Sequence, residues 1–276
     1  MPSARPYIMN IIDVDTLDLP ELEPYRTLRA HTQHWRDGHF VAEGEKAVRA
    51  LLSSSLSVRS MLISRDWLPL VEEGRASGAL NETTIFIAPD ALLEGIVGYS
   101  LHKRLLAVGT LPANPSLDSL HAAGSRAGVY VALEAIADAE NMGMILRNCA
   151  AFGVDGLIVG SDSASPYLRR SVRVSLGNVF SLRIHRSEDL LESLRRCRTE
   201  FGWRVVGTTP RGGARRLASP DPDRPLCLLF GSEAHGLTEM AASLCDELFT
   251  IPMRDDVDSI NVANAVAVAL YEATRM

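Results

Sequence analysis

Long apolar runs, lysine and aromatic residues are all scarce in this sequence. No segment approaches the roughly 18 consecutive apolar residues that a membrane-spanning helix needs, so no such helix is predicted. Residues 1–20 carry three aspartates and lack a basic segment followed by an apolar one, which argues against a secretory signal peptide. We therefore expect a cytoplasmic protein with no membrane partner.

Cysteine is also rare, and its spacing is wide. Cys149, Cys197, Cys227 and Cys245 form no Cys-x-x-Cys pair. This pattern excludes a dense disulfide framework and a cysteine-rich zinc site. No other cluster of ligand residues stands out, and we expect no metal cofactor.

The charge balance excludes a strongly basic domain. The formal net charge is −6, whereas nucleic-acid-binding domains are often basic. All basic residues except Lys46 and Lys103 are arginine. Arginine binds phosphate with a better geometry than lysine, but genomic base composition is the simpler explanation of this preference. Composition alone does not indicate an RNA enzyme.

The 276 residues are enough for one large domain or two modest ones, and their pattern favours two. A stretch rich in Pro, Ser, Gly and Ala leads us to interpret residues 111–127 as a linker. Short strands and an amphipathic helix before it predict a small α/β domain over residues 28–110. Residues 1–27 form an acidic extension to which the pattern assigns no structure.

Strands and helices alternate regularly over residues 128–276. Apolar segments predict strands at 129–133, 157–159, 204–207, 226–230 and 248–251, and helical spacing predicts helices at 141–152, 189–200 and 261–275. This order predicts a parallel sheet covered by helices on both faces. The last helix is apolar nearly all round, so it must be buried within the domain or against another subunit.

Three groups of residues follow predicted strands, where open α/β sheets place their ligand sites. The first group contains Asn141, Gly143 and Arg147. An arginine in the first turn of a helix is well placed to hold a phosphate. A solvent-exposed arginine without a role is the alternative interpretation.

The second group is a loop, Gly231 to Gly236, that contains Glu233 and follows a buried strand. Its glycines free the backbone to wrap around a ligand. No Lys-Ser/Thr pair follows Gly236, and the Gly-x-Gly-x-x-Gly fingerprint is missing, so neither a Walker loop nor a dinucleotide site is indicated. We interpret His235 as a surface residue of this loop rather than as a base.

The third group follows the strand that ends before Pro252. An acidic loop leads to Ser259, Ile260 and Asn261 at the start of the last helix. Ser259 is a good N-cap residue, and that structural role explains it when it is considered alone. A functional role for it depends on the other two groups.

Taken in order, the groups read Asn-x-Gly-x3-Arg, Phe-Gly-Ser-Glu-x2-Gly-Leu and Ile-Pro-Met-x6-Ile-Asn-Val. This order resembles the SpoU/TrmH family of RNA ribose methyltransferases, which belong to the knotted SPOUT class. The resemblance implies a C-terminal α/β domain with a deep trefoil knot over residues 128–276, to which residues 165–177 are also similar. Residues 39–48 are similar to the family's ribosomal-protein-like RNA-binding domain.

The resemblance implies a use for each group. S-adenosyl-L-methionine would lie in the knot against the main chain of Gly231, Ile251 and Ile260, with Thr208 closing its pocket. Leucine is commoner than isoleucine at position 260, but the apolar contact should survive this change.

Arg147 would face the phosphate of the target nucleotide and assist removal of the ribose 2′-hydroxyl proton. Because arginine does not ordinarily act as a base, a phosphate or a carboxylate would accept that proton, and the sequence leaves this choice open. Glu233, Ser259 and Asn261 would position the arginine, the hydroxyl and the cofactor. Further RNA contacts are implied for Asn141 and Arg173.

The implied activity is methyl transfer from S-adenosylmethionine to a ribose 2′-hydroxyl in structured RNA. Ribosomal RNA is preferred over transfer RNA because the N-terminal domain resembles one used for ribosomal RNA. A homodimer through the C-terminal domain is implied as well. A tRNA methyltransferase and a catalytically silent RNA-binding protein on the same fold are the alternatives, and a dehydrogenase is a distant third.

Overall fold

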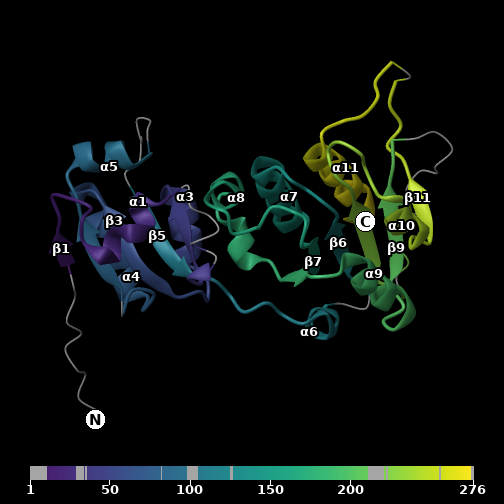
Figure 1. Cartoon of the computed structure of the whole chain (residues 1–276). Coiled ribbons are helices and arrows are strands. Elements are labelled where there is room, and N and C mark those ends of the chain that lie inside the picture. Colours follow the sequence, from purple (N-terminus) through teal and green to yellow (C-terminus); the bar gives the residue numbers. More distant parts are fainter. Residues whose placement is uncertain are drawn as a thin grey trace, which may run out of the picture. The chain divides into compact units, whose positions relative to one another are not determined.

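The structure is a computed structural model that describes residues 11–28, 34, 36–81, 83–97, 105–124, 127–210, 221, 223–254 and 256–274. The chain packs into two compact units, each built around its own sheet (Figure 1). The N-terminal unit comprises Met1–Pro112 and Tyr167–Phe180, and the C-terminal unit comprises Ala113–Pro166 and Ser181–Met276.

The N-terminal unit contains a mixed five-stranded sheet in the order β1-β4-β3-β5-β2. Its strands are β1 (Ile11–Asp13), β2 (His39–Glu43), β3 (Val58–Ile63), β4 (Thr84–Ile87) and β5 (Leu105–Thr110). Strands β2 and β3 pair antiparallel with β5, whereas β1 and β3 pair parallel with β4. The helices are η1 (Pro20–Leu22), α1 (Glu23–Arg26), α3 (Glu45–Leu52), η2 (Arg65–Trp67), α4 (Leu68–Ala76) and α5 (Asp90–Val97).

Part of the N-terminal extension belongs to the core of this unit. Strand β1 joins the sheet, and Leu22 and Tyr25 are fully buried. The hydroxyl of Tyr25 is hydrogen-bonded to the hydroxyl of Ser60 at 2.8 Å. The elements here are too short to produce a periodic pattern, which is why the sequence assigned them no structure. Residues 1–10 lie outside the described residues.

A segment from the second half of the chain also packs into the N-terminal unit. It contains α8 (Arg169–Val174) and the start of η3 (Asn178–Ser181). The ring of Phe40 lies 5.7 Å from that of Tyr167 and 5.1 Å from that of Phe180. A Cβ atom at Gly177 would lie 2.6 Å from the Cβ of Ala50, so the backbone approaches α3 closely. The family resemblance had grouped this segment with residues 128–276.

The C-terminal unit contains six parallel strands in the order β11-β9-β10-β6-β7-β8, which confirms the predicted parallel sheet. They are β6 (Val129–Leu133), β7 (Gly156–Gly160), β8 (Ile184–Ser187), β9 (Arg204–Thr208), β10 (Leu226–Phe230) and β11 (Glu247–Phe249). Successive residues of β6 and β10 point to opposite faces, and both strands are buried throughout. Helices therefore cover the sheet on both sides.

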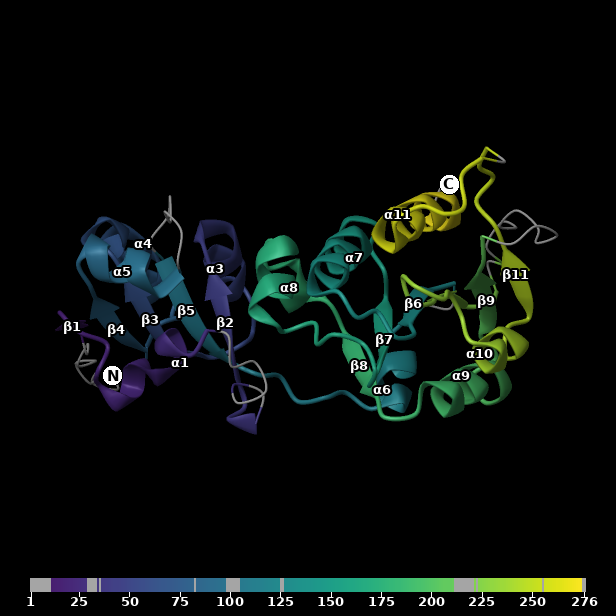
Figure 2. The same cartoon turned by 45° about the horizontal axis from the view of Figure 1, so that its top comes forward.

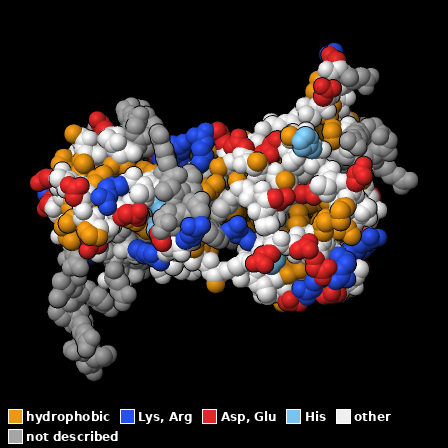
Figure 3. Space-filling model, in the orientation of Figure 1, with side chains coloured by type: hydrophobic (Ala, Val, Ile, Leu, Met, Phe, Trp, Pro, Cys, Tyr) orange, Lys and Arg blue, Asp and Glu red, His pale blue; other side chains and the backbone are white. Residues whose placement is uncertain are grey.

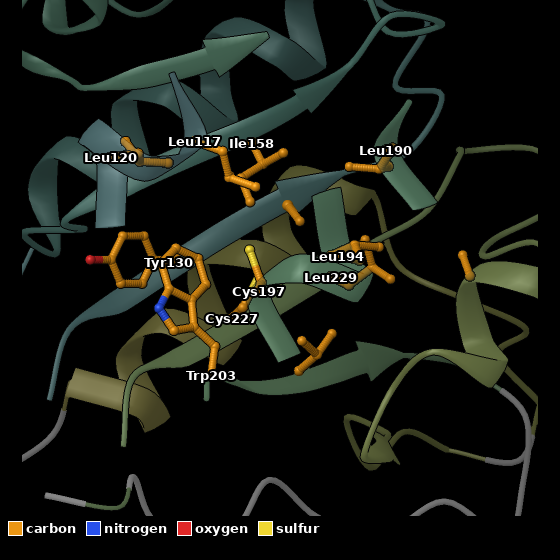
Figure 4. Close-up of a cluster of buried hydrophobic side chains, with 13 residues drawn as sticks. Leu117, Leu120, Tyr130, Ile158, Leu190, Leu194, Cys197, Trp203, Cys227 and Leu229 are labelled. Atoms are coloured by element: carbon orange, nitrogen blue, oxygen red, sulfur yellow. The ribbon is translucent and has the colours of Figure 1, made fainter. Parts of the chain in front are cut away.

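One face of this sheet carries α6 (Leu117–Ala122), α9 (Leu190–Thr199) and α10 (Glu239–Ser243). Figure 4 shows Leu117 and Leu120 of α6 and Leu190, Leu194 and Cys197 of α9 in one cluster with Trp203 and Tyr130, whose rings stack at 3.8 Å. Helices α7 (Ala139–Ala151) and α11 (Val262–Thr274) lie together on the opposite face (Figures 1 and 2). None of the helices in the described part of the chain is long and apolar enough to span a membrane.

The stretch interpreted as a linker contains a helix of the C-terminal core. Ser116 caps α6 by accepting a hydrogen bond from the amide of Ser119, and Leu117 and Leu120 are buried. A helix of six residues is too short to show a periodicity among flanking prolines and serines. Composition was therefore misleading over this part of residues 111–127, of which 125 and 126 lie outside the described residues.

Candidate active site

A cleft of about 1260 Å³ opens where β9, β10 and β11 end. Because the strands are parallel, their carboxyl ends meet at one edge of the sheet, and the starts of α7 and α11 complete the wall. The cleft brings together most of the predicted site residues, namely Asn141, Thr208, Gly231, Glu233, Ile251, Ser259, Ile260 and Asn261. Arg147 and Arg173 do not line it.

The loop after β10 is closed by its own backbone. Ser232 and Gly236 exchange two hydrogen bonds of 3.1 and 2.9 Å, and Gly236 has a φ of 70°, in the left-handed region. A Cβ atom at Gly231 would lie 2.2 Å from the carbonyl carbon of Gly236. Only glycine fits at position 231, so main chain rather than a side chain forms this part of the wall.

Three side chains join the predicted groups through hydrogen bonds. Asn261 donates from Nδ2 to Oδ1 of Asn141 at 2.8 Å, and Asn141 donates from Nδ2 to Oε1 of Glu233 at 2.9 Å. Glu233 also accepts from the amides of Ala137 at 3.3 Å and Asp138 at 3.4 Å. The start of α7, the loop after β10 and the start of α11 therefore form one network.

Asn261, not Ser259, caps the last helix. The amide of Ala263 donates to Oδ1 of Asn261 at 2.9 Å, and α11 begins at Val262. Ser259 is exposed, and its hydroxyl makes no hydrogen bond to any residue that the structure describes. The interpretation of Ser259 as the N-cap of the last helix is therefore wrong, because that helix begins at Val262, too far along the chain for Ser259 to cap it.

Asn148 is a contact that the sequence interpretation missed. Its Nδ2 donates to the carbonyl of Ala263 in the first turn of α11 at 2.8 Å. Asn148 follows Asn141 by two helical turns, so both side chains lie on the face of α7 that meets α11. The two-turn spacing between Asn141 and Asn148 was the feature of the sequence that could have predicted this contact.

Arg147 lies deeper in its helix than predicted. Helix α7 begins at Ala139, capped by Asp138, so Arg147 is its ninth residue and not part of the first turn. It stands about 9 Å along the axis from Asn141. The side chain is exposed and has no hydrogen bond or ion pair with a described residue.

Arg173 belongs to the N-terminal unit, where it contacts a buried carboxylate. Glu43, whose side chain is 4% exposed, accepts from Arg173 at 3.4 Å and from Arg169 at 2.5 Å. Sequence spacing could not reveal this contact, because Glu43 lies 130 residues away in the chain.

The model of the SpoU rRNA Methylase family matches residues 128–271. The chain belongs to this family. The match covers the cleft and its whole sheet, and it confirms the resemblance inferred from the three residue groups.

Relatives of this SpoU chain cover nearly its full length. A tRNA/rRNA methyltransferase of Mycobacterium bovis is 31% identical over 282 residues, 99% of this chain and 95% of that protein. The 23S rRNA (uridine(2479)-2′-O)-methyltransferase of Streptomyces viridochromogenes is 31% identical over 248 residues, 87% and 84% of the two chains. The AdoMet-bound rRNA methyltransferase from Sinorhizobium meliloti has a TM-score of 0.80 at 25% identity, covering 96% and 98%. The α/β fold class is therefore confirmed.

The carboxylate of Glu233 is held in its charged form by its hydrogen-bond donors. Burial raises the pKa of Glu233, but hydrogen bonds from Asn141, from its own amide and from the amides of Ala137 and Asp138 lower it more. The net effect is a pKa below the usual value for a glutamate. A carboxylate engaged in this way is a fixed anion and a weak proton acceptor.

The SpoU cleft is bordered by a loop that projects between β11 and α11 (Figure 1). Figure 3 shows basic and acidic side chains together at its tip, where Arg254 donates to Asp256 at 3.1 Å. This pairing partly neutralises the acidic loop noted in the sequence, although Asp255 lies outside the described residues. His235 is exposed, in agreement with the interpretation of a surface residue.

Proposed function

We propose that this protein transfers a methyl group from S-adenosylmethionine to a ribose 2′-hydroxyl of structured RNA, with ribosomal RNA as the preferred substrate. The observation that carries the proposal is the hydrogen-bonded series Asn261–Asn141–Glu233, which unites the three residue groups at one cleft. Relatives that methylate 23S ribosomal RNA support the class of substrate.

The cleft suits S-adenosylmethionine in size and in chemistry. Its volume exceeds the roughly 300–1,000 Å³ of typical small-molecule sites, which leaves room for a nucleotide beside the cofactor. Leu237, Leu248, Ile251 and Ile260 offer apolar contacts to an adenine ring, and Gly231 lines the same cleft without a side chain. We assign Gly231, Ile251, Ile260 and Thr208 to cofactor binding.

The cofactor supplies an activated methyl group, so the residues need only orient the hydroxyl and assist loss of its proton. The ribose oxygen attacks the methyl carbon, the bond from that carbon to sulfur breaks, and the hydroxyl proton passes to an acceptor. Glu233 is poorly suited as this acceptor, because its pKa is lowered and its oxygens are occupied. We assign it to holding Asn141 in place.

Among the four predicted catalytic residues, Arg147 and Ser259 lie outside the hydrogen-bonded series, and we assign them to face RNA. The exposed guanidinium of Arg147 is suited to a phosphate, and the exposed hydroxyl of Ser259 lies in the cleft wall. A phosphate of the RNA, brought next to Arg147, is then the acceptor that we favour for the proton. We assign Asn141 and Asn261 to positioning.

Two features of the whole chain belong to the same proposal. The first is a deep trefoil knot within residues 128–276, with residues 28–110 forming a ribosomal-protein-like RNA-binding domain. The second is a homodimer through α11, which is supported by Val268 and Tyr271, exposed by 41% and 55% on its outer side. Val266 and Leu270, on the inner side of the same helix, are buried inside the unit.

The test is transfer of labelled methyl from S-adenosylmethionine to purified ribosomal and transfer RNA. We expect label in ribosomal RNA, lost in the Arg147→Ala variant. Mapping ribose methylation in total RNA with and without the gene then identifies the nucleotide. Label in transfer RNA alone would contradict the substrate class, and RNA binding without any transfer would indicate the silent protein.

A further inference from the structure

The loop after β10 is attached at both ends to a single residue of the neighbouring strand. Glu134 directly follows β6, and its amide donates to the carbonyl of Phe230, just before the loop, at 2.9 Å. Its carboxylate accepts from the amide of Thr238 at 2.9 Å and from the hydroxyl of Thr238 at 2.7 Å. Gly231–Leu237, which carries Glu233, lies between these two attachments.

The carboxylate of Glu134 is buried, since the residue is only 7% exposed. A charged group so far from water needs hydrogen-bond donors, and Thr238 supplies two. The Thr238 hydroxyl in turn accepts from the amide of Ala241 at 3.1 Å and so caps α10. The hydroxyl of Thr238 has a single proton, which it donates to Glu134, so it can only accept in its hydrogen bond with Ala241.

This arrangement restricts the loop before any ligand arrives. The Ser232–Gly236 hydrogen bonds shape its middle, and Glu134 holds its two ends. Ala135, next to Glu134, has a φ of 53°, a conformation that a non-glycine residue adopts only where its surroundings impose it. Ordering a loop costs conformational entropy, and a loop ordered in advance binds its ligand more tightly.

We propose that Glu134 is a positioning residue for the cofactor, because it holds the loop that carries Gly231 and Glu233 in its binding shape. This inference rests on the proposed function, since it assigns that loop to S-adenosylmethionine. Neither Glu134 nor Thr238 was among the predicted site residues. Glu134 acts through the loop rather than on the reacting atoms.

The experiment measures S-adenosylmethionine binding by calorimetry in the full chain. Glu134→Gln replaces one acceptor oxygen by an amide that faces the Thr238 donors, and Thr238→Val removes the hydroxyl. We expect each variant to raise the Kd by about 10-fold, the usual effect of losing a charge-assisted hydrogen bond. Thr238→Ser keeps the hydroxyl and should bind within about twofold of the wild type.

Two further variants complete the binding experiment: a double variant at Glu134 and Thr238, and a control at another carboxylate that binds a backbone amide. Glu134→Gln with Thr238→Val should bind no more weakly than either variant alone, because both remove one interaction. Asp155→Asn is the control, since Asp155 accepts from the amide of Val129 at 3.0 Å at the opposite end of β6. It should lower thermal stability and leave the Kd unchanged.

Hydrogen exchange gives a second readout that does not depend on catalysis. The amides of residues 231–237 should exchange faster in Glu134→Gln and at the wild-type rate in Asp155→Asn. Wild-type protein that binds no S-adenosylmethionine would overturn the proposed function and this assignment with it. Wild-type binding with unchanged Kd values in Glu134→Gln and Thr238→Val would overturn the assignment alone.

Discussion

Asn141 donates to Glu233 and accepts from Asn261, so its amide has one productive orientation. The two neighbours explain why this position needs an amide: a carboxylate could not donate to Glu233, and an apolar side chain could do neither. Glu233 stays charged because its partners are donors. At the scale of single residues, the site is defined by the direction of its hydrogen bonds.

The Arg147→Ala variant tests the residue that stands outside this network. We expect methyl transfer to fall by about 10²-fold or more, the typical loss when a charge-assisted contact of the transition state is removed. The Kd for S-adenosylmethionine should stay within about threefold, because Arg147 does not line the cleft. Arg195→Ala, an exposed arginine on α9, is the control. Wild-type turnover in Arg147→Ala would refute the assignment.

The pH dependence of stability tests Glu233. Its pKa is lowered by folding, so the stabilisation is complete above the unfolded value of 4.5 and is lost as pH falls through the folded value. The Glu233→Gln variant has no ionisable group at this position and therefore lacks this pH-dependent stabilisation. Urea unfolding from about pH 7 to about pH 3 should therefore show a difference between the two proteins that shrinks below pH 4.5. A constant difference would show that the charge of Glu233 contributes nothing.

At the scale of elements, fully buried apolar strands were predictable, whereas a half-buried strand and a short helix were not. Strands β6 and β10 match the predicted residues, because an uninterrupted apolar run fixes both ends. Strand β8 has only its first and last residues buried, and α6 is a single short helix, so neither produced a signal. The start of α7 was placed late because its cap, Asp138, precedes polar residues.

Two hydrogen bonds made by asparagine side chains link α7 to the start of α11, and Asn148→Ala tests the second of them. It should lose about 1 kcal/mol of stability, as expected for one hydrogen bond, and about 10-fold in kcat, because Ser259 and Asn261 precede the turn that Asn148 holds. Asn114→Ala removes two hydrogen bonds with the backbone of Arg186, one to its carbonyl at 2.9 Å and one from its amide at 2.8 Å. This control should lose stability alone. Equal kcat values for the two variants would contradict the role.

At the scale of the whole molecule, α11 tests the proposed dimer. The charged substitution Val268→Asp changes an exposed position and should leave the fold intact while raising the dimer dissociation constant by about 10-fold or more. Val266→Asp, at a buried position, should instead prevent folding. Sedimentation velocity separates the two effects. A wild-type protein that is monomeric at micromolar concentration and fully active would contradict the dimer.

The three residue groups and the parallel sheet follow from local properties, namely where apolar strands stop and which residues come next, whereas the uses proposed for the site residues came from the family resemblance. The sequence alone determined these features because parallel strands bring their carboxyl ends to one edge. Only the tertiary structure decided which distant partners meet: Glu134 with Thr238, Glu43 with Arg173, and Asn141 with Asn261. The direction and burial of a hydrogen bond depend on where both partners lie in space, and the spacing of residues along the chain does not specify those positions.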